Sequence, residues 1–201
     1  MGHKFKPQNW ERLMSDERRA LLDPDRFLDQ LDIKRGDVTA DIGAGPGFFT
    51  LPLAERVGPR GKVYALDVAP EMVAQLRLLS LPAQVEVLLS MENRLPLPDG
   101  IVDVALLAFV LHELDKSRLF LADVRRILRP AGRLVVLEWV PQEEQFGPPL
   151  HERIASEDSA RALVAAGFRV LGGGTVNASA YYHIAAADHH DLTPAHPESL
   201  R

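Results

Sequence analysis

The sequence predicts an α/β fold: a doubly wound, mostly parallel seven-stranded sheet with one antiparallel strand near the C-terminus. Short apolar runs alternate with segments of helical periodicity along most of the 201 residues, which is the order of parallel strands joined by helices. The run 102–107 is apolar at nearly every position, as strands buried on both faces are. The last two predicted strands follow each other without a helix between them, and such strands can pair antiparallel.

The first half of the chain predicts strand–helix units after two short helices. Asp23 and Pro24 fit the N-cap and the first position of the second helix, because a side-chain oxygen and a fixed φ both favour a helix start. A turn at 35–37 precedes the first strand, and 58–61 breaks the helix that follows it. The predicted helices are 16–22, 24–31, 48–57 and 70–80, and the predicted strands are 38–42, 62–66 and 85–89.

The second half continues this alternation. Segment 96–100 has the composition of a turn and precedes strand 102–107. Apolar residues recur at helical spacing through 116–128, and the Arg-Pro-Ala-Gly stretch 129–132 ends that helix. The remaining predicted elements are strand 134–140, helix 156–166 and strands 168–171 and 180–186, with Gly172, Gly173 and Gly174 in the connection between the last two strands.

The elements from strand 38–42 onward fill one domain, 31–187, with no internal repeat. Before it, 1–30 is predicted as an N-terminal helical segment; its basic and aromatic residues, His3-Lys4-Phe5 and Trp10, form either a lid over the site or a plain packing arm. After it, 188–201 is predicted as a polar tail. Asp188-His189-His190-Asp191 has the composition of a metal ligand set, but we interpret it as solvated and predict no metal site.

Composition excludes several classes of protein. Acidic residues outnumber basic ones by 28 to 23, for a net charge of −5, which disfavours nucleic acid as a partner. The chain has no cysteine, so disulfides, thiolate metal sites and cysteine nucleophiles are excluded. No apolar run approaches the length of a membrane span, and the first residues lack the apolar core of a signal peptide. We therefore expect a cytoplasmic protein without a membrane span.

The most informative motif is Asp41-Ile42-Gly43-Ala44-Gly45-Pro46-Gly47, between a predicted strand and a predicted helix. Glycines in such a turn adopt backbone angles that other residues resist, and they let a ligand approach the main chain. The spacing is G-x-G-x-G, and Phe48 stands where the dinucleotide pattern G-x-G-x-x-G has its third glycine. No Lys-Ser or Lys-Thr pair follows the turn, so it is not a P-loop.

Asp67 ends the next predicted strand. A carboxylate at this point accepts hydrogen bonds from both ribose hydroxyls and repels a 2′-phosphate. The alternative is that Asp67 only caps the helix opened by Pro70. A strand, a glycine turn, a helix, a second strand and a terminal acid, in this order, predict a nucleoside-binding site.

Together these residues closely resemble the first two motifs of class I S-adenosylmethionine-dependent methyltransferases. Three further stretches are similar to that family: 99–104 to its fourth-strand motif, 128–134 to the turn into its fifth strand, and 166–168 to a helix-to-strand step near its C-terminus. The resemblance covers about residues 30 to 186 and is greatest for the small-molecule branch of quinone-biosynthesis and arsenite methyltransferases. Arsenite enzymes use cysteine thiolates, which this chain lacks. The resemblance implies a Rossmann-like sheet and S-adenosylmethionine as cofactor.

Carried over by position, the resemblance also implies the residues that bind the cofactor. The glycine turn passes under the methionine portion, Asp67 holds the ribose, and an apolar wall faces adenine. Segment 90–93 reads the adenine amino group, but Ser90 replaces a frequent aspartate and one extra residue follows, so its register stays open. For Glu92 the alternative is a solvated loop acid. The expected cofactor-binding residues are Asp41, Gly43, Ala44, Gly45, Gly47, Asp67, Val68, Met72, Met91, Glu92 and Ala108.

The reaction is expected at the carboxyl ends of the strands, where His112, Glu138 and Trp139 follow the fourth and fifth strands. His112 is the candidate catalytic base because its ordinary pKa lies near neutrality; otherwise it caps a helix or pairs with Glu113. Glu138 orients a ligand or pairs with an arginine as a buried carboxylate. Trp139 lines the acceptor pocket or covers the core. Segment 140–153 is either an acceptor-binding loop or a connector stiffened by its prolines.

The leading hypothesis is a methyltransferase that acts on a small-molecule acceptor. The alternative is a non-catalytic, regulatory protein that binds S-adenosylmethionine or S-adenosylhomocysteine. A nicotinamide oxidoreductase is disfavoured by Phe48, and a nucleic-acid methyltransferase by net charge and by the lack of an Asn-Pro-Pro-Tyr-like segment after the fourth strand. The acceptor atom and the oligomeric state cannot be read from the sequence, because this scaffold serves many reactions.

Overall fold

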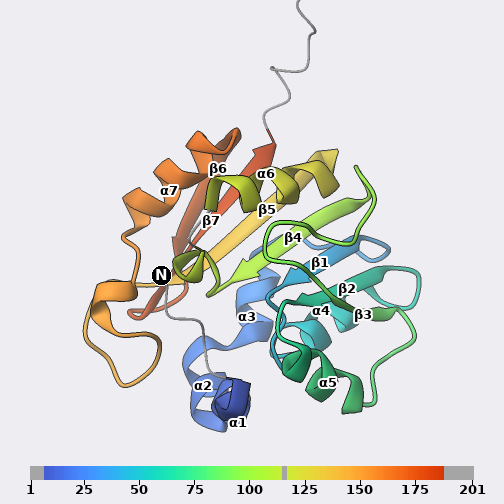
Figure 1. Ribbon diagram of the computed structural model, residues 1–201, viewed down its shortest axis with the longest axis horizontal. Coiled ribbons are helices and arrows are strands. Elements are labelled where there is room, and N and C mark those ends of the chain that lie inside the picture. Colours follow the sequence, from blue (N-terminus) through green and yellow to red (C-terminus); the bar gives the residue numbers. More distant parts are fainter. Residues whose placement is uncertain (1–6, 115–116, 188–201) are drawn as a thin grey trace, which may run out of the picture.

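The computed structural model describes residues 7–114 and 117–187, which form a seven-stranded sheet between helices (Figure 1). The strand order is β3-β2-β1-β4-β5-β7-β6. The first five strands pair in parallel, whereas β7 lies antiparallel between β5 and β6. Among the described strands β7 alone runs against the others, which confirms the predicted Rossmann-like sheet. The strands are β1 (Val38–Ile42), β2 (Lys62–Asp67), β3 (Val85–Leu89), β4 (Val102–Ala108), β5 (Leu128–Trp139), β6 (Phe168–Thr175) and β7 (Ala180–Ala187).

The predicted polar tail 188–201, with its Asp-His-His-Asp stretch, lies outside the described residues. So does 1–6, the start of the predicted N-terminal segment that contains His3, Lys4 and Phe5. The described helices are α1 (Trp10–Leu13), α2 (Asp16–Leu22), α3 (Pro24–Asp29), α4 (Thr50–Val57), α5 (Pro70–Leu78), α6 (Ser117–Ile127) and α7 (Ser156–Ala165). Asp23 caps α3 as predicted, because its carboxylate accepts a hydrogen bond from the N–H of Arg26.

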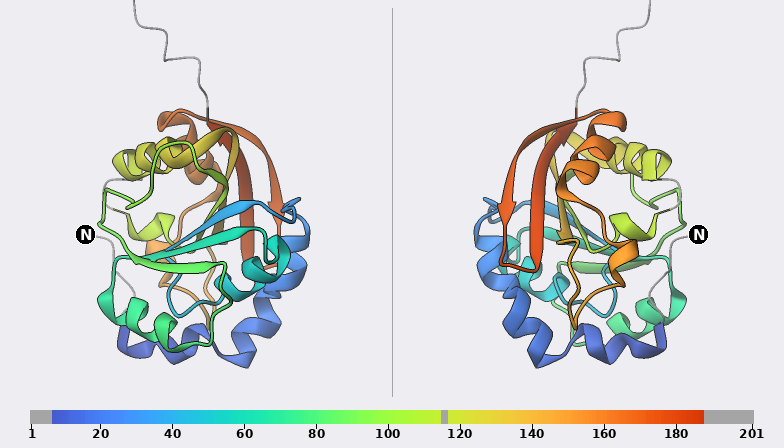
Figure 2. Two further views of the ribbon diagram at one scale, coloured as in Figure 1. Left: turned by 90° about the vertical axis from the view of Figure 1, so that its right-hand side faces the viewer. Right: turned by 90° about the vertical axis from the view of Figure 1, so that its left-hand side faces the viewer.

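Helices cover both faces of the sheet, as Figure 2 shows from two sides. Alternate residues of β4 explain this arrangement, since neighbouring side chains of a strand point to opposite faces. Val104 and Leu106 belong to an apolar cluster with α2, α3 and α4. Ala105 and Leu107 belong to a second cluster with α6 and α7. Both faces of this strand are therefore buried, which accounts for its nearly continuous apolar sequence.

Two sequence predictions were wrong about where β5 and β6 run. β5 begins at Leu128, which pairs with Val102, and the next pair is Arg133 with Val104, so 129–132 bulges from the ladder instead of ending a helix before the strand. Gly172, Gly173 and Gly174 lie within β6 rather than in the connection to β7. A Cβ on Gly173 would overlap the carbonyl oxygen of Tyr182, so close approach of the neighbouring strand explains this glycine.

Candidate functional site

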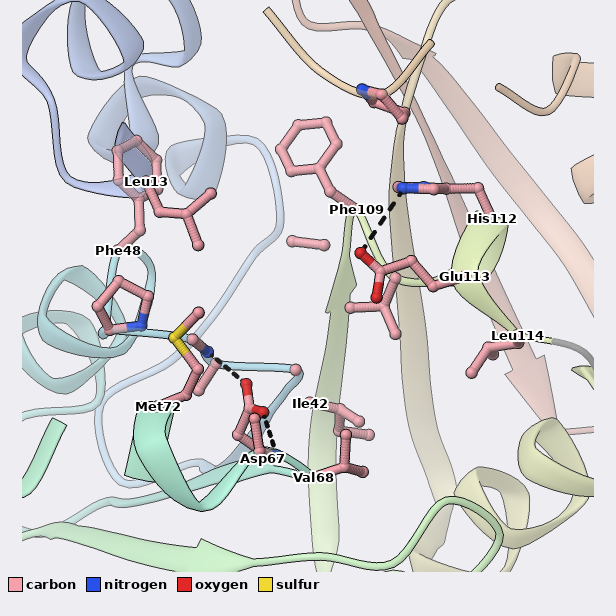
Figure 3. Close-up of a pocket in the computed structure, with 18 of the residues that line it drawn as sticks. Leu13, Ile42, Phe48, Asp67, Val68, Met72, Phe109, His112, Glu113 and Leu114 are labelled. Atoms are coloured by element: carbon pink, nitrogen blue, oxygen red, sulfur yellow. Dashed lines mark hydrogen bonds and ion pairs between the residues drawn. The ribbon is translucent and has the colours of Figure 1, made fainter. Parts of the chain in front are cut away.

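A cavity of about 940 Å³ lies at the carboxyl ends of β1, β2 and β4 (Figure 3). Its volume is within the range of small-molecule sites, and its position is the one where open α/β sheets bind ligands. The wall combines predicted residues with others from the N-terminal helices and from the loop after β5. The predicted residues on the wall are Gly43, Ala44, Gly45, Asp67, Val68, Met72, Met91, Glu92, Ala108 and His112.

The glycine turn forms the floor of the cavity. Gly43 and Gly45 have positive φ angles of 74° and 53°, which L side chains rarely adopt. A Cβ on Gly43 would overlap the side chain of Val110, whereas a Cβ on Gly45 would approach only Leu13, at 3.6 Å. A side chain on Gly45 would fill space that the cavity now occupies. This cradle fits a ligand that lies against the main chain.

Asp41 and Gly47 support the turn from behind and are not among the residues that line the cavity. The Asp41 carboxylate is buried and accepts a 2.6 Å hydrogen bond from the hydroxyl of Thr50. Burial raises the pKa of Asp41 to about 7, although the Thr50 bond opposes the shift and the charge of Asp67 adds to it. A Cβ on Gly47 would lie 2.6 Å from Leu76 Cδ1. Their contribution is therefore to the shape of the turn.

Asp67 joins the glycine turn to the start of α5. One carboxylate oxygen accepts the N–H of Gly45 at 2.8 Å and the other accepts the N–H of Ala69 at 2.9 Å, as the dashed lines in Figure 3 show. Burial raises the pKa of Asp67, and hydrogen bonds from Ala69, Gly45 and Val68 partly oppose the shift. The two oxygens together have about four lone-pair sites, so these backbone bonds leave acceptor capacity for a ligand. The carboxylate is thus fixed at the cavity wall and can still accept a hydrogen bond from a ligand hydroxyl.

The segment after β3 forms the neighbouring wall. Met91 and Arg94 form an isolated bridge, and all four residues of 90–93 line the cavity. The following residues are held by α6, because Asp123 accepts the N–H of Leu95 at 2.6 Å and Arg126 donates to the carbonyl oxygens of Leu95 and Leu97. The side chain of Met91 is 71% exposed, so it forms the rim of the cavity rather than its interior.

His112 lies on the opposite wall, in a short 3₁₀ turn after β4. Its Nδ1 is 2.8 Å from Oε2 of Glu138, and its backbone N–H donates to Oε1 of the same carboxylate at 3.2 Å. Glu113 is more distant, with 3.9 Å between its Oε1 and Nε2 of His112. Burial alone would lower the pKa of His112, but the hydrogen bond and charge of Glu138, together with the charges of Glu113 and Glu152, outweigh it and raise the pKa.

The partner of Glu138 is therefore a histidine and not the arginine that the sequence left open. Glu138 is fully buried at the end of β5. Holding Nδ1 with a carboxylate fixes the tautomer of an imidazole and directs its other nitrogen elsewhere. Nε2 of His112, which is 3.9 Å from Oε1 of Glu113, is the ring nitrogen that Glu138 does not hold.

Aromatic and proline side chains complete the wall near His112. The rings of Phe109 and Trp139 stack with their centres 4.4 Å apart. The loop that contains Phe146, Pro148 and Pro149 also lines the cavity, and a Cβ on Gly147 in this loop would lie 2.9 Å from the Trp139 ring. The buried Arg153 holds the loop by donating to the carbonyl oxygens of Pro148 and Val140. Trp139 thus both covers the core and lines the cavity. This loop is part of segment 140–153, whose role as an acceptor-binding loop stays a prediction.

Several cavity residues were missed by sequence reasoning. Leu13 and Arg18 come from the N-terminal helices. Phe109 belongs to the segment after β4 that was expected to border the methyl donor; it does line the cavity, with a left-handed backbone and φ of 59°. Phe48, which replaces the third dinucleotide glycine, packs its ring on Phe49 and beneath the guanidinium of Arg18. The spacing of residues in the sequence does not predict contacts of this kind between distant segments. Within 7–114 and 117–187, no group of three acidic or imidazole side chains could hold a metal ion, and no helix is long and apolar enough to cross a membrane.

Comparison with known proteins agrees with this fold. Residues 40–136 match the family described as "Methyltransferase domain". The ubiquinone/menaquinone biosynthesis C-methyltransferase UbiE of Cupriavidus metallidurans is 30% identical over an alignment of 154 residues that covers 70% of this chain and 63% of that protein. An uncharacterized 37.1 kDa protein in transposon TN4556 of Streptomyces fradiae is 44% identical over 114 residues, 56% of this chain and 33% of that protein. The chain therefore spans between a third and two thirds of the length of these curated relatives.

A solved structure matches over nearly its whole length. The crystal structure of a SAM dependent methyltransferase from Aquifex aeolicus is 36% identical, with a TM-score of 0.86 over 90% of this chain and 98% of that one. The sheet order, the glycine turn with its terminal acid and this similarity lead to one conclusion. The chain belongs to the class I S-adenosylmethionine-dependent methyltransferase family and resembles its UbiE group.

Proposed function

We propose that this chain transfers a methyl group from S-adenosylmethionine to a small-molecule acceptor. The observation that supports this most directly is the arrangement of one cavity, with the glycine turn and Asp67 on one wall and the His112–Glu138 pair on another. A donor bound along the first wall and an acceptor bound along the second would share the same enclosed space. Such placement is the main requirement of the reaction, because methyl transfer depends on proximity and alignment.

The chain's own residues fit the donor in chemical character. Asp67 would hold the ribose hydroxyls, and Gly45 leaves the main chain open to the methionine portion. Val68 and Met72 supply an apolar surface for adenine next to segment 90–93. Bound S-adenosylmethionine supplies an activated methyl group on a positively charged sulfur. The protein need only hold the acceptor against it and keep water out.

His112 is proposed as the group that takes a proton from the acceptor. Glu138 holds Nδ1 and the backbone N–H of His112, so Nε2 is directed away from β5. Deprotonating an acceptor hydroxyl or carbon acid increases its nucleophilicity, and a positioned imidazole performs this step near neutral pH. Glu138 acts through His112 and has no place among the residues that line the cavity. It is therefore a positioning residue in this scheme.

The acceptor is proposed to be planar and largely apolar. The stacked rings of Phe109 and Trp139 offer a flat aromatic surface, and the proline loop faces it. One relative is named for C-methylation in ubiquinone and menaquinone biosynthesis, and phenols and hydroquinones have the shape that this wall fits. The net charge of −5 supports a partner other than nucleic acid. Cytoplasmic localisation stays a prediction from the sequence.

Calorimetric titration with S-adenosylmethionine and S-adenosylhomocysteine tests donor binding, and transfer of a labelled methyl group to a panel of phenols and hydroquinones tests the reaction. We expect both ligands to bind and at least one acceptor to be methylated. Binding without transfer across the panel would favour the regulatory alternative. If neither nucleoside binds, the proposal fails, and titration with NAD then tests the oxidoreductase interpretation.

A further inference from the structure

Arg18 is a buried cation in the cavity wall that no motif predicted. It lies on α2 and is only 8% exposed. Its guanidinium carbon is 4.5 Å from the centre of the Phe48 ring and 5.5 Å from that of Phe109. Its Nη1 donates to the carbonyl oxygen of Leu13 at 2.8 Å. These contacts fix the position of the guanidinium at the cavity.

This charge has no acidic partner among the described residues. The contacts of the Arg18 side chain there are the Leu13 carbonyl and the faces of two aromatic rings. An aromatic face attracts a cation but does not neutralise it. The buried Arg153, by contrast, pairs with Glu144 at 3.2 Å and with backbone carbonyls. Buried charges are ordinarily paired. Arg18, unlike Arg153, has no anionic partner among the described residues, so we expect its partner to be an anionic ligand.

The guanidinium is suited to bind that anion. Burial lowers the pKa of Arg18 to about 10, so the side chain still carries its charge near neutral pH. One of its N–H groups donates to Leu13, and the fork geometry leaves others for a planar carboxylate. Arg18 and the neighbouring Arg12 both line the cavity. The N-terminal wall of the cavity is therefore positively charged.

We propose that Arg18 binds the carboxylate of a ligand in this cavity, an inference that rests on the proposed function. Two molecules could supply the carboxylate. The first is the donor, because Leu13, which holds Arg18, is also the residue nearest to Gly45 in the cradle for the methionine portion. The second is an acceptor that bears an acidic group, because Arg18 also contacts Phe109 of the aromatic wall. The same charge-assisted hydrogen bonds would form with either.

The donor arm of the test compares two nucleosides that differ in the amino-acid end. S-adenosylhomocysteine has the carboxylate, and 5′-methylthioadenosine lacks it. We expect Arg18→Gln to weaken S-adenosylhomocysteine binding about 10- to 100-fold, the usual effect of losing a charged hydrogen bond, and to leave 5′-methylthioadenosine within about twofold. Arg18→Lys keeps the positive charge but lacks the planar guanidinium, so its affinity for S-adenosylhomocysteine should lie between those of the wild type and Arg18→Gln. Calorimetry provides all the affinities.

The acceptor arm compares benzoate with benzamide, which share a ring but differ in charge. Both are titrated with and without saturating S-adenosylhomocysteine. If the acceptor supplies the carboxylate, Arg18→Gln weakens benzoate binding and leaves benzamide binding and S-adenosylhomocysteine binding unchanged. The matched control is Arg19→Gln, because Arg19 is the adjacent arginine, its side chain is 46% exposed and it pairs with Asp25 outside the cavity.

The outcomes separate this proposal from the proposed function. If Arg18→Gln weakens binding of the charged probe alone in either arm, the result supports anion binding at Arg18 and shows which ligand supplies the carboxylate. Equal affinity of wild type and Arg18→Gln for all four probes overturns the inference. If wild type binds neither nucleoside, the proposed function fails, and benzoate alone still tests the site. Thermal unfolding of the ligand-free variants tests for a structural role of Arg18. A lowered unfolding temperature, together with equal losses of affinity for charged and neutral probes, would also overturn the inference.

Discussion

The carboxylate of Glu138 accepts two hydrogen bonds from a single residue, the side chain and the backbone N–H of His112. Both partners are almost fully buried, although they lie 26 residues apart in the chain. The pair connects the turn after β4 with the end of β5 and faces the cavity through the histidine. Its chemistry gives the first prediction.

Methyl transfer should depend on pH through His112. A base must be deprotonated, and the pKa of His112 is raised above its ordinary value of 6.5, so kcat/KM should rise with pH through a midpoint above 6.5. Glu138→Gln removes the charge but leaves the burial, which by itself lowers the pKa, so the midpoint should move to lower pH. His112→Gln should reduce kcat about 100-fold or more. A pH–rate profile that Glu138→Gln leaves unmoved would contradict the pairing.

Asp67 should determine affinity for the nucleoside. Asp67→Asn keeps the shape but loses one acceptor and the charge, so S-adenosylhomocysteine should bind about 10- to 100-fold more weakly. Burial raises the pKa of Asp67, so the carboxylate becomes protonated at a higher pH than an ordinary aspartate. The affinity of the wild type for S-adenosylhomocysteine should therefore fall as the pH is lowered through the pKa of Asp67. Calorimetry between pH 5 and 8 measures both effects. Glu71→Gln, at an exposed position in the first turn of α5, is the control and should change neither.

Gly43 should tolerate no side chain, for two separable reasons. Its φ is +74°, and a Cβ there would overlap the side chain of Val110. Gly36 has a φ of +95° but nothing within 4 Å of its Cβ position, so Gly36→Ala measures backbone strain alone, about 1 kcal/mol. Gly43→Ala should cost about 1 to 3 kcal/mol more in the free energy of unfolding.

The second change of this series removes the clash. Adding Val110→Ala to Gly43→Ala should recover part of the lost stability, because it shortens the side chain that a new Cβ would meet. Urea unfolding of the single and double variants measures the coupling. Purely additive effects would mean that the turn shifts to avoid Val110.

Stability should fall as pH rises because of Asp41. Its pKa is raised from 3.8 to about 7 by burial, so the native state binds a proton that the unfolded state has released. The contribution is therefore present at low pH and is lost as pH rises from about 4 to 7. Asp41→Asn cannot titrate, so its stability relative to wild type should increase over this range by up to about 4 kcal/mol. Thr50→Val removes the hydrogen bond that opposes the shift and should strengthen the pH dependence.

The sequence predicted the cavity wall that is formed by the glycine turn and Asp67, because these residues are contiguous or stand at strand ends. Gly43, Gly45 and Asp67 need only the order of strand, turn and acid, and all three lie at the cavity as expected. Asp41 and Gly47 belong to the same motif but face its supporting side. A motif therefore indicates which segment forms a site more reliably than which side chain reaches the ligand.

The remaining parts depend on contacts that sequence spacing does not encode. Arg18 lies among the four consecutive charged residues Asp16 to Arg19, which resemble a solvated helix surface, and only the packing of α2 on Phe48 buries it. His112 and Glu138 were separate candidates, and their pairing requires β4 and β5 to be neighbours in a particular register. Gly173 resembled a loop residue because glycine disfavours strands, but the neighbouring backbone leaves room for nothing larger.

The position of β7 has a consequence for how the chain is made. In the described sheet β6 pairs with β7 alone, yet β6 precedes β7 in the sequence. A ribosome therefore releases β6 before the strand that joins it to β5 exists, and the edge of β5 stays open until 180–187 has emerged. Open edges invite pairing with other chains. A chain that terminates before residue 180 lacks β7, so β5 and β6 have no strand between them to join them. We expect such truncated nascent chains to be the species that aggregates.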